Sequence, residues 1–271
     1  MLPTSELIEI VREASRAEVM PRFRALDTAD IQVKSRVDDL VTKADLAAER
    51  RITEAVAQLM PEAAIVGEEA VATDPSILFR IAEADICVIL DPIDGTWNYA
   101  HGSSMFGMIL AVTNCGETVF GLLYDPVNDD WIEATRRQGA WFCRAERRER
   151  LTLAPSPAVA EANAFIAPYL LPLEMRPAIW SGMQSVGRAS SLRCSCHEYR
   201  MLATGAAQIG FAAMLNPWDH AAGVLIHCEA GGVARLLDGR DYAPTLHAGR
   251  LLLAADEPGW QAAAGLFPTD L

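Results

Sequence analysis

The sequence predicts an α+β protein with a layered α-β-α-β-α architecture. Its strand-like segments come in runs, and Gly, Asn and Asp turns divide residues 105–143 into an antiparallel meander. Helical patterns precede the meander and mix with further strands in the second half. A 51% hydrophobic composition over 271 residues is enough to bury a large core. We therefore expect layered sheets and helices rather than alternating βαβ units.

Two amphipathic helices are expected before the first buried strands. The first covers residues 4–24, and the second covers residues 43–60 and is stopped by Pro61. Thr42 and Asp45, at the start of the second helix, have the spacing of a capping box, with Asp in place of the usual Glu. A purely structural role as a helix cap is therefore one interpretation of Asp45.

Strands and the remaining helices follow in chain order. A short strand over residues 64–67 and a buried strand over residues 86–90 both end in acidic residues. The charged run 144–150 is expected to be a solvated hairpin. The meander strands are expected at 105–114, 118–124, 131–135 and 140–143, the later strands near 163–166, 209–213 and 250–255, and the later helices near 173–182, 197–204 and 218–230.

Charge and hydropathy narrow the functional class. The chain carries 36 acidic and 23 basic residues, a net charge of −13, which argues against nucleic-acid binding. No segment offers the roughly 20 apolar residues that a membrane span needs, and the N-terminus lacks the basic region of a secretion signal. We expect a cytoplasmic protein that forms a single unit over residues 1–271, with an α+β half (1–150) and an α/β half (151–271).

The cysteines do not have the spacing of a zinc site. No CxxC pair occurs, and the close pair Cys194 and Cys196 lacks a second Cys/His cluster nearby. We expect free thiols, most of them buried. The full set is Cys87, Cys115, Cys143, Cys194, Cys196 and Cys228.

Clustered acid after a buried strand indicates a bound cation. Asp91 and Asp94 follow such a strand, and an ionised carboxylate is costly to bury without a positive partner. Glu68 and Asp219 also end apolar runs. Carboxylates and backbone carbonyls, such as that of Ile93, are the ligands of hard divalent ions such as Mg²⁺. The alternative is an ordinary β-turn, because Asp-Pro-x-Asp-Gly contains typical turn residues.

The residues after Asp94 predict an anion site. Gly95 and Thr96 open a short helix that runs to about His101, and the N–H groups at a helix start attract phosphate. Cation ligands followed directly by an anion site are the arrangement of metal-assisted phosphoryl hydrolysis. For His101 and His220, which lie in or beside these motifs, we expect structural or rim roles.

Several motifs together resemble the inositol monophosphatase family of Mg²⁺-dependent, lithium-sensitive sugar phosphatases. One signature is matched by ILDPIDGTWNY at residues 89–99, and the other by WDHAAGVLIHCEAGG at residues 218–232. Residues 67–69, residues 39–45 and Lys34 match as well, in the family's order. The resemblance implies the layered sugar-phosphatase fold, a homodimer, and hydrolysis of a small-molecule phosphate monoester by direct attack of metal-activated water.

The resemblance also implies about two to three Mg²⁺ ions. Glu68, Asp91 and the carbonyl of Ile93 would hold the first ion. Asp91, Asp94 and Asp219 would hold the second, so the α/β half supplies one ligand to a site built mainly by the α+β half. A third, weaker ion would depend on Glu68.

The same resemblance assigns the catalytic residues. Thr96, oriented by Asp45, would position the attacking water and help to deprotonate it, and Glu68 would act with them. The N–H groups of Gly95 and Thr96 would bind the phosphate. Asp94 and Asp219 would also contact the substrate.

The substrate pocket departs from the family pattern. Members that act on inositol phosphate carry a Glu at the position of Ala212, which cannot accept a hydrogen bond from a polyol. Arg193 and Ser195 lie in a second substrate-contacting segment, where the family has small residues. We hypothesise that inositol 1-phosphate is not the best substrate and that Arg193 meets a second anionic or polar group. A surface or subunit-interface arginine is the alternative.

Three further alternatives remain open at the level of function. Relatives of the same fold hydrolyse histidinol phosphate or fructose 1,6-bisphosphate. A non-catalytic regulator could keep the fold, although it would be free to lose Asp45, Glu68, Thr96 or Asp219, and all four are present. A structural Ca²⁺-binding module would need neither the pair of Thr96 and Asp45 nor an anion site.

Overall fold

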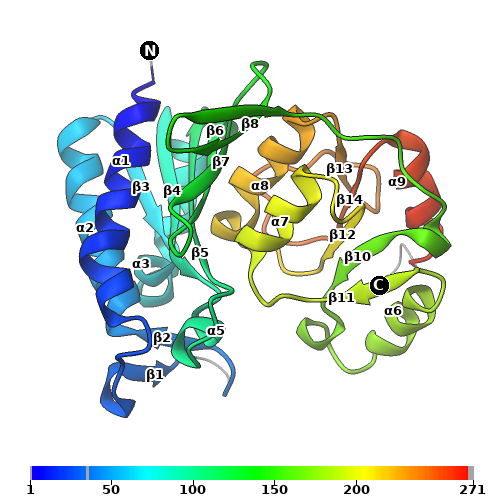
Figure 1. The fold of residues 1–271 in the computed structure, drawn as a ribbon, viewed down its shortest axis with the longest axis horizontal. Coiled ribbons are helices and arrows are strands. Elements are labelled where there is room, and N and C mark those ends of the chain that lie inside the picture. The colour runs from blue at the N-terminus through cyan, green and yellow to red at the C-terminus, as the bar shows by residue number, and fades with distance from the viewer. Residues whose placement is uncertain (1, 35–36, 268–271) are drawn as a thin grey trace.

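The computed structural model describes residues 2–34 and 37–267, and its five layers confirm the expected α-β-α-β-α architecture (Figure 1). Two sheets, each covered by helices on both faces, stand side by side. From left to right in Figure 1, the helical layers contain α1 (Thr4–Ala14) and α2 (Lys43–Leu59), then α7 (Ser195–Ala203) and α8 (Pro217–Glu229), then α6 (Arg176–Met183) and α9 (Glu257–Ala264).

The first sheet has seven strands in the order β3-β4-β5-β6-β7-β8-β9. β3 and β4 are parallel, the strands from β4 to β9 pair antiparallel, and β5 to β8 form the meander predicted over residues 105–143. The charged run 144–150 is confirmed as a hairpin, in which the residues from Arg147 to Arg150 are exposed. The strands are β3 (Ala64–Gly67), β4 (Ile86–Asp94), β5 (Gly107–Asn114), β6 (Glu117–Asp125), β7 (Asp130–Thr135), β8 (Ala140–Arg144) and β9 (Arg147–Leu151).

The second sheet has five strands in the order β11-β10-β12-β14-β13. β10 is parallel to β11 and β12, whereas β14 is antiparallel to β12 and β13. The three strands expected in this half are confirmed within two residues at each end, and β11 and β13 were not expected. The strands are β10 (Asn163–Ile166), β11 (Arg188–Ser190), β12 (Ile209–Ala212), β13 (Val233–Leu236) and β14 (Leu251–Ala254).

Short elements gather around the strand ends of the first sheet. A two-stranded antiparallel ribbon precedes α2, and short helices follow β3 and β4. No helix within the described ranges is long and apolar enough to cross a membrane. These elements are β1 (Ile31–Val33), β2 (Leu40–Thr42), α3 (Glu68–Thr73), α4 (Arg80–Glu83), α5 (Thr96–Ala100), and 3-10 turns at Thr28–Asp30 and Pro75–Phe79. Two further 3-10 turns, at Val159–Glu161 and Pro168–Leu170, flank β10 of the second sheet.

The first helix is less regular than the sequence predicts. α1 ends at Ala14, and the chain continues through a π-helical turn (Ser15–Val19) and a 3-10 turn (Met20–Arg22). Pro21 has no backbone N–H with which to extend the α-helical ladder. The prediction of one α-helix over residues 4–24 was therefore wrong beyond Ala14.

The acidic motif lies on a strand and not on the turn that the sequence suggested. β4 continues to Asp94, and its residues Asp91 and Asp94 pair with Ile109 and Gly107 of β5. The register shifts between the two acids, where Pro92 cannot donate to the ladder. Residues three apart on a regular strand point to opposite faces, so this irregularity lets both carboxylates enter one site.

Alternation along the first sheet builds a core on each of its faces. Val88 and Leu90 of β4 belong to the cluster that includes α1 and α2, and Cys87 and Ile89 belong to the cluster that includes α7 and α8. A third core covers the outer face of the second sheet. Full burial of one such aliphatic side chain contributes roughly 1.5–3 kcal/mol. As expected, all six cysteines are free and four are buried, namely Cys87, Cys143, Cys194 and Cys196.

Glycines bring α8 close to its neighbours. A Cβ on Gly121 of β6 would lie 2.8 Å from the carbonyl oxygen of Ala222 in α8. A Cβ on Gly223 would lie 2.2 Å from the ring of Tyr199 in α7. The first turn of α8 is thereby held beside the end of β4.

Candidate metal centre

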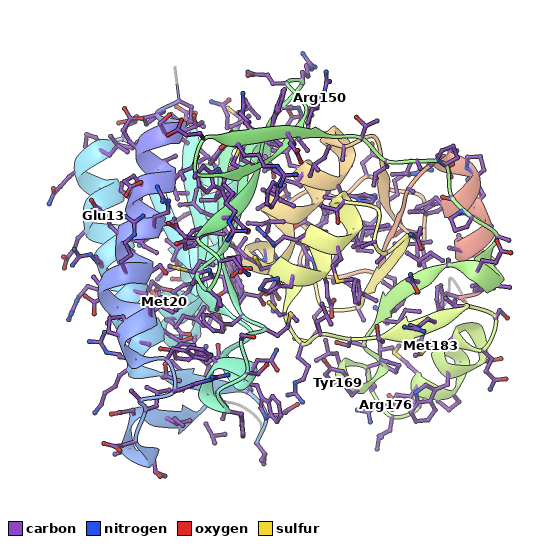
Figure 2. All side chains as sticks on the ribbon, viewed as in Figure 1. Glu13, Met20, Arg150, Tyr169, Arg176 and Met183 are labelled. Carbon is purple, nitrogen blue, oxygen red and sulfur yellow. The ribbon has the colours of Figure 1, made fainter. Side chains whose placement is uncertain are left out.

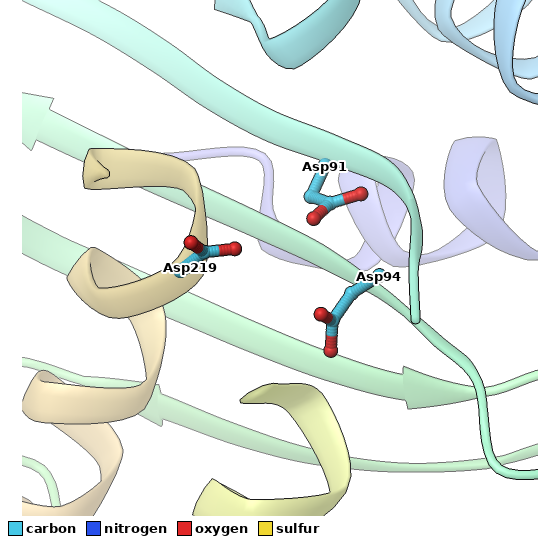
Figure 3. A group of neighbouring side chains, drawn as sticks. All are labelled: Asp91, Asp94 and Asp219. Atoms are coloured by element: carbon cyan, nitrogen blue, oxygen red, sulfur yellow. The ribbon is translucent and has the colours of Figure 1, made fainter. Parts of the chain in front are cut away.

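Three carboxylates, two of them buried and that of Asp219 half-buried, converge from two parts of the chain at the end of β4. Asp91 and Asp94 come from β4, and Asp219 comes from the first turn of α8. One carboxylate oxygen from each lies within 4.8 Å of the others. Figure 3 shows the three side chains directed toward a common space between the strand and the helix. The sequence predicted this set, but only folding brings Asp219 to the other two.

Each carboxylate is oriented by a neighbouring donor. Asp91 Oδ1 accepts a hydrogen bond from the backbone N–H of Ile93 at 3.0 Å. Asp94 Oδ2 accepts from the backbone N–H of Cys196 and from the thiol of Cys194, the latter at 3.1 Å. Asp219 Oδ2 accepts from the side-chain amide of Asn216, at 3.0 Å. In the part of the chain that the structure describes, no lysine or arginine forms an ion pair with the three acids.

Burial raises the pKa of all three acids. The pKa of Asp94 is raised to about 6, chiefly because the carboxylate is desolvated. The pKa values of Asp91 and Asp219 lie well above their usual range, first because of burial and then because of the neighbouring carboxylates. Three like charges in a desolvated space repel one another, so a bound cation would stabilise their ionised forms.

Glu68 lies at the edge of this cluster, held by Lys34. Because β3 is parallel to β4, with Gly67 beside Leu90, Glu68 follows the strand end next to Asp91. Lys34 Nζ lies 2.9 Å from Glu68 Oε1 and 2.6 Å from Glu69 Oε1. Glu68 is therefore outside the trio of Asp91, Asp94 and Asp219 in this structure, although its charge contributes to the raised pKa of Asp91.

A buried acid that sequence reasoning missed supports Glu68. The carboxylate of Glu49 in α2 accepts hydrogen bonds from the backbone N–H groups of Glu69 and Ala70, both at 2.8 Å. A Cβ on Gly67 would lie 2.4 Å from the carboxyl carbon of Glu49 and would displace that carboxylate from these N–H groups. Glu49 follows Asp45 by one helical turn, and that spacing was the available signal.

Asp45 caps α2 and also reaches the candidate site. Its Oδ2 accepts hydrogen bonds from the backbone N–H and the hydroxyl of Thr42, which completes the predicted capping box. Its Oδ1 lies 3.1 Å from Thr96 Oγ1, which is also 2.9 Å from the carbonyl oxygen of Ile93. Burial raises the pKa of Asp45 to about 7. The structural and functional interpretations of this residue are therefore compatible.

Gly95 makes the tight transition from β4 to α5. Its φ of +85° lies in the left-handed region, and a Cβ would lie 3.0 Å from the carbonyl oxygen of Met105 and 3.2 Å from Cys194 Cβ. The side-chain amide of Asn98 in α5 donates to the carbonyls of Met105 and Leu192, at 2.7 and 2.8 Å. Asn98, which sequence reasoning did not single out, thus joins the two halves of the chain at the site.

These residues surround one cavity of about 520 Å³. Its wall contains acids of the cluster, the start of α5 and segments of the second half. Ala212 lies in the wall of this cavity. The charged and polar lining residues include Lys34, Asp38, Asp39, Glu68, Asp94, Thr96, Tyr169, Ser191, Arg193, Ser195, Glu198, Asn216 and Asp219.

Both histidines singled out from the sequence have structural partners. His220 Nδ1 lies 2.9 Å from the hydroxyl of Tyr199, and Nε2 lies 2.7 Å from the carbonyl oxygen of Met214. Burial lowers the pKa of His220 to about 4, so the imidazole is neutral at pH 7 and supports the loop before Asp219. His101 stacks on Trp97 with ring centroids 4.1 Å apart.

The layered fold and the acidic centre define a class of α+β proteins with a candidate divalent-cation site. The family model for the inositol monophosphatase family matches residues 4–268. The chain belongs to the inositol monophosphatase family, as the sequence motifs indicated.

Curated relatives span more than one role. A fructose-1,6-bisphosphatase/inositol-1-monophosphatase of Thermotoga maritima is 27% identical over 214 residues, 78% of this chain and 77% of that protein. Inositol monophosphatase 1 of Rattus norvegicus is 29% identical over 83% of this chain and 80% of that protein. The Nus factor SuhB of Escherichia coli is 27% identical over 87% of this chain and 86% of that protein.

Solved structures share the fold over nearly the whole chain. An inositol monophosphatase from Zymomonas mobilis superposes with a TM-score of 0.78 at 25% identity, covering 98% of this chain and 96% of that one. The extragenic suppressor protein suhB from Bartonella henselae gives a TM-score of 0.81 at 20% identity, with 99% of both chains covered.

Proposed function

We propose that this protein is a Mg²⁺-dependent hydrolase of small-molecule phosphate monoesters. The observation that carries the proposal is the cluster of Asp91, Asp94 and Asp219, which lies at the cavity, is largely withdrawn from solvent and has no basic ion-pair partner in the described ranges. Membership in a family of phosphatases supports the same function.

The donor set fits hard divalent ions. All three acids offer carboxylate oxygens, and the carbonyl of Ile93 retains a lone pair beside the hydrogen bond from Thr96. Glu68, Asp91 and Ile93 would hold one Mg²⁺, and Asp91, Asp94 and Asp219 would hold another. A third ion at Glu68 would compete with Lys34 for the same carboxylate.

Bound Mg²⁺ would supply Lewis-acid chemistry, favouring ionisation of the nucleophilic water and stabilising the leaving alkoxide. The chain's own residues orient the reactants. Thr96 Oγ1, which donates toward Asp45 or Ile93, has lone pairs that would accept a hydrogen bond from the attacking water. Asp45 would take up the proton relayed through Thr96. The N–H groups of Gly95 and Thr96 would bind the phosphate.

Three properties extend the proposal. The halves 1–150 and 151–271 would act as one unit, because the acidic cluster combines Asp91 and Asp94 with Asp219. The protein would form a homodimer, as family resemblance implies. Lithium ions would suppress activity by competing at the Mg²⁺ sites, so an activity curve unchanged by lithium would contradict that element of the proposal.

The test is Mg²⁺-dependent phosphate release by the purified protein on inositol 1-phosphate, histidinol phosphate, fructose 1,6-bisphosphate, NADP and adenosine 3′,5′-bisphosphate. Asp94→Asn is the control, because it retains the side-chain shape but removes a charge. Release that requires Mg²⁺ and disappears in the control supports the proposal. Bound Mg²⁺ without release from any ester would contradict it and favour a regulatory role, such as the one that the name Nus factor gives to SuhB. Activation by Ca²⁺ in place of Mg²⁺ would also contradict it.

A further inference from the structure

Arg193 places a cation in the cavity wall that the acidic cluster does not use. Its Cζ lies 4.3 Å from the ring centroid of Trp97 and 5.6 Å from that of Tyr169. Figure 2 shows Tyr169 in the lower part of the view near Arg176, whose guanidinium donates to the Tyr169 carbonyl oxygen at 2.8 Å. Nη2 donates to Asp38 Oδ2 at 3.3 Å, and 31% of the side chain is exposed. Within the described ranges, this is the one hydrogen bond of a guanidinium that carries five N–H groups.

The backbone at Arg193 is strained and firmly supported. Its φ of +55° lies in the left-handed region, which is strained for a residue with a Cβ. The preceding residue, Leu192, donates its N–H to Glu198 at 2.7 Å and accepts from Asn98 at 2.8 Å. Glycine would adopt this conformation without strain, so the conformation itself does not explain the arginine.

The adjoining wall is poor in groups that recognise a polyol. Phe211, Ala212 and Met214 line the cavity with apolar side chains. Trp97 already contacts Arg193 and His101, so it does not offer a free ring for a nucleobase. Phe211, Ala212 and Met214 thus offer a polyol no side-chain hydrogen bond, and the group that the Arg193 guanidinium would bind is an anion.

On the basis of the proposed function, we infer that Arg193 binds a second anionic group of the substrate, a phosphate or a carboxylate. Lys34, the other cation in the described cavity wall, is held by Glu68 and Glu69, whereas Arg193 meets only the more exposed Asp38. A guanidinium fixed by aromatic rings presents its remaining donors in a planar fork suited to either anion. The substrate class is then small phosphate esters with a second negative group.

The experiment compares paired esters that differ in the second group. Fructose 1,6-bisphosphate against fructose 1-phosphate tests a second phosphate, and 3-phosphoglycerate against glycerol 3-phosphate tests a carboxylate. Arg193→Gln should lower kcat/KM about tenfold or more for at least one ester that carries the second anionic group, the scale of a lost charge-assisted pair. Its effect on the partner ester should stay within about twofold. Arg193→Gly should give the same loss of discrimination between the paired esters without loss of thermal stability. Arg188→Gln, at an exposed position of β11, should change neither the discrimination nor the thermal stability.

A binding measurement separates this inference from the proposed function. The same pairs are titrated calorimetrically into wild type and Arg193→Gln with Ca²⁺ in place of Mg²⁺. If the ester with the second anionic group binds more tightly than its partner, and this preference is lost in Arg193→Gln, the inference is supported even if no ester is hydrolysed. Equal losses on both members of each pair, or no loss, overturn it even if the protein proves to be a phosphatase. If the glutamine variant fails to fold, the same comparison is made with Arg193→Gly.

Discussion

Thr96 lies where the proposed metal, phosphate and proton-transfer roles meet. Its hydroxyl is within hydrogen-bonding distance of Asp45 and of the carbonyl of Ile93. Its backbone begins α5 immediately after Gly95. A side chain at this point affects the orientation of the nucleophile without serving as a ligand in the acidic trio.

Replacing the hydroxyl of Thr96 should separate catalysis from stability. Thr96→Val keeps the shape but removes the group that orients water, and kcat should fall about 100-fold, the typical scale of a lost general-base relay. Thr96→Ser should retain most of the rate. The measurement is steady-state phosphate release beside thermal unfolding. If the valine and serine variants have equal kcat, the hydroxyl has no part in the reaction.

Asp219→Asn should reduce activity and increase metal-free stability. Removing one of three repelling carboxylates relieves a buried like charge, and a gain of about 1 kcal/mol corresponds to a Tm rise of roughly 2–4 °C. Phosphate release should fall at least about 100-fold, because a cation ligand is lost. Calorimetry in chelator and a kinetic assay check both effects. A lower Tm in the metal-free variant would show that the cluster is not under electrostatic strain.

At the scale of elements, the packing of α8 on the first sheet controls where Asp219 lies. Gly121→Ala would place a Cβ 2.8 Å from the Ala222 carbonyl oxygen, so α8 must shift away from β6. We expect a stability loss of about 1–3 kcal/mol, typical of overpacking. We also expect weaker Mg²⁺ binding, measured by titration on the folded variant. Gly121 does not lie in the left-handed region, so the loss would come from the Cβ contact and not from backbone strain. Unchanged Mg²⁺ affinity in Gly121→Ala would show that the packing of α8 on β6 does not control the metal site.

Sequence reasoning recovered elements whose signals are local. The capping box of Thr42 and Asp45 marks the start of α2, and the apolar run of β4 and the turn residues of the meander are local signals of a sheet. Short strands such as β11, with three residues, carry too little pattern to be recognised. The strand through Asp94 was missed because turn residues and a bulged strand end have the same composition.

The candidate site was predictable as a set of acids but not as a network. Signature motifs named Asp91, Asp94 and Asp219, which the fold brings together. The support of α3 by Glu49 and the bridge from Asn98 to Leu192 depend on tertiary contacts with no fixed sequence spacing. The conformation of Arg193 also follows from the loop around it, which only the structure reveals.

For the whole molecule, the buried acids couple stability to pH and metal. Their folded-state pKa values are raised, to about 6 for Asp94 and about 7 for Asp45, so the folded state binds more protons than the unfolded state. This stabilising contribution is fully present below about pH 4, the unfolded pKa of Asp, and is lost as pH rises through 6 to 8. In chelator, Tm should therefore fall from pH 5 to pH 8.

Added Mg²⁺ should reverse that trend, because it competes with protons for the same carboxylates. The increase in Tm on adding Mg²⁺ should be larger at pH 8 than at pH 5, as measured by thermal unfolding. Asp219→Asn is the matched control and should show a shallower pH dependence in chelator. A metal-free Tm that rises over this range would mean that the acids are ionised and stabilised without a cation.

The most direct test of the central claim restores Mg²⁺ to metal-stripped protein and follows phosphate release from an ester with two phosphate groups, such as fructose 1,6-bisphosphate. The account predicts no release before addition, a rise that saturates with Mg²⁺ in wild type, and none in Asp219→Asn. Release that is independent of Mg²⁺, or equal in the two proteins, would contradict a metal-dependent phosphatase built on these three acids.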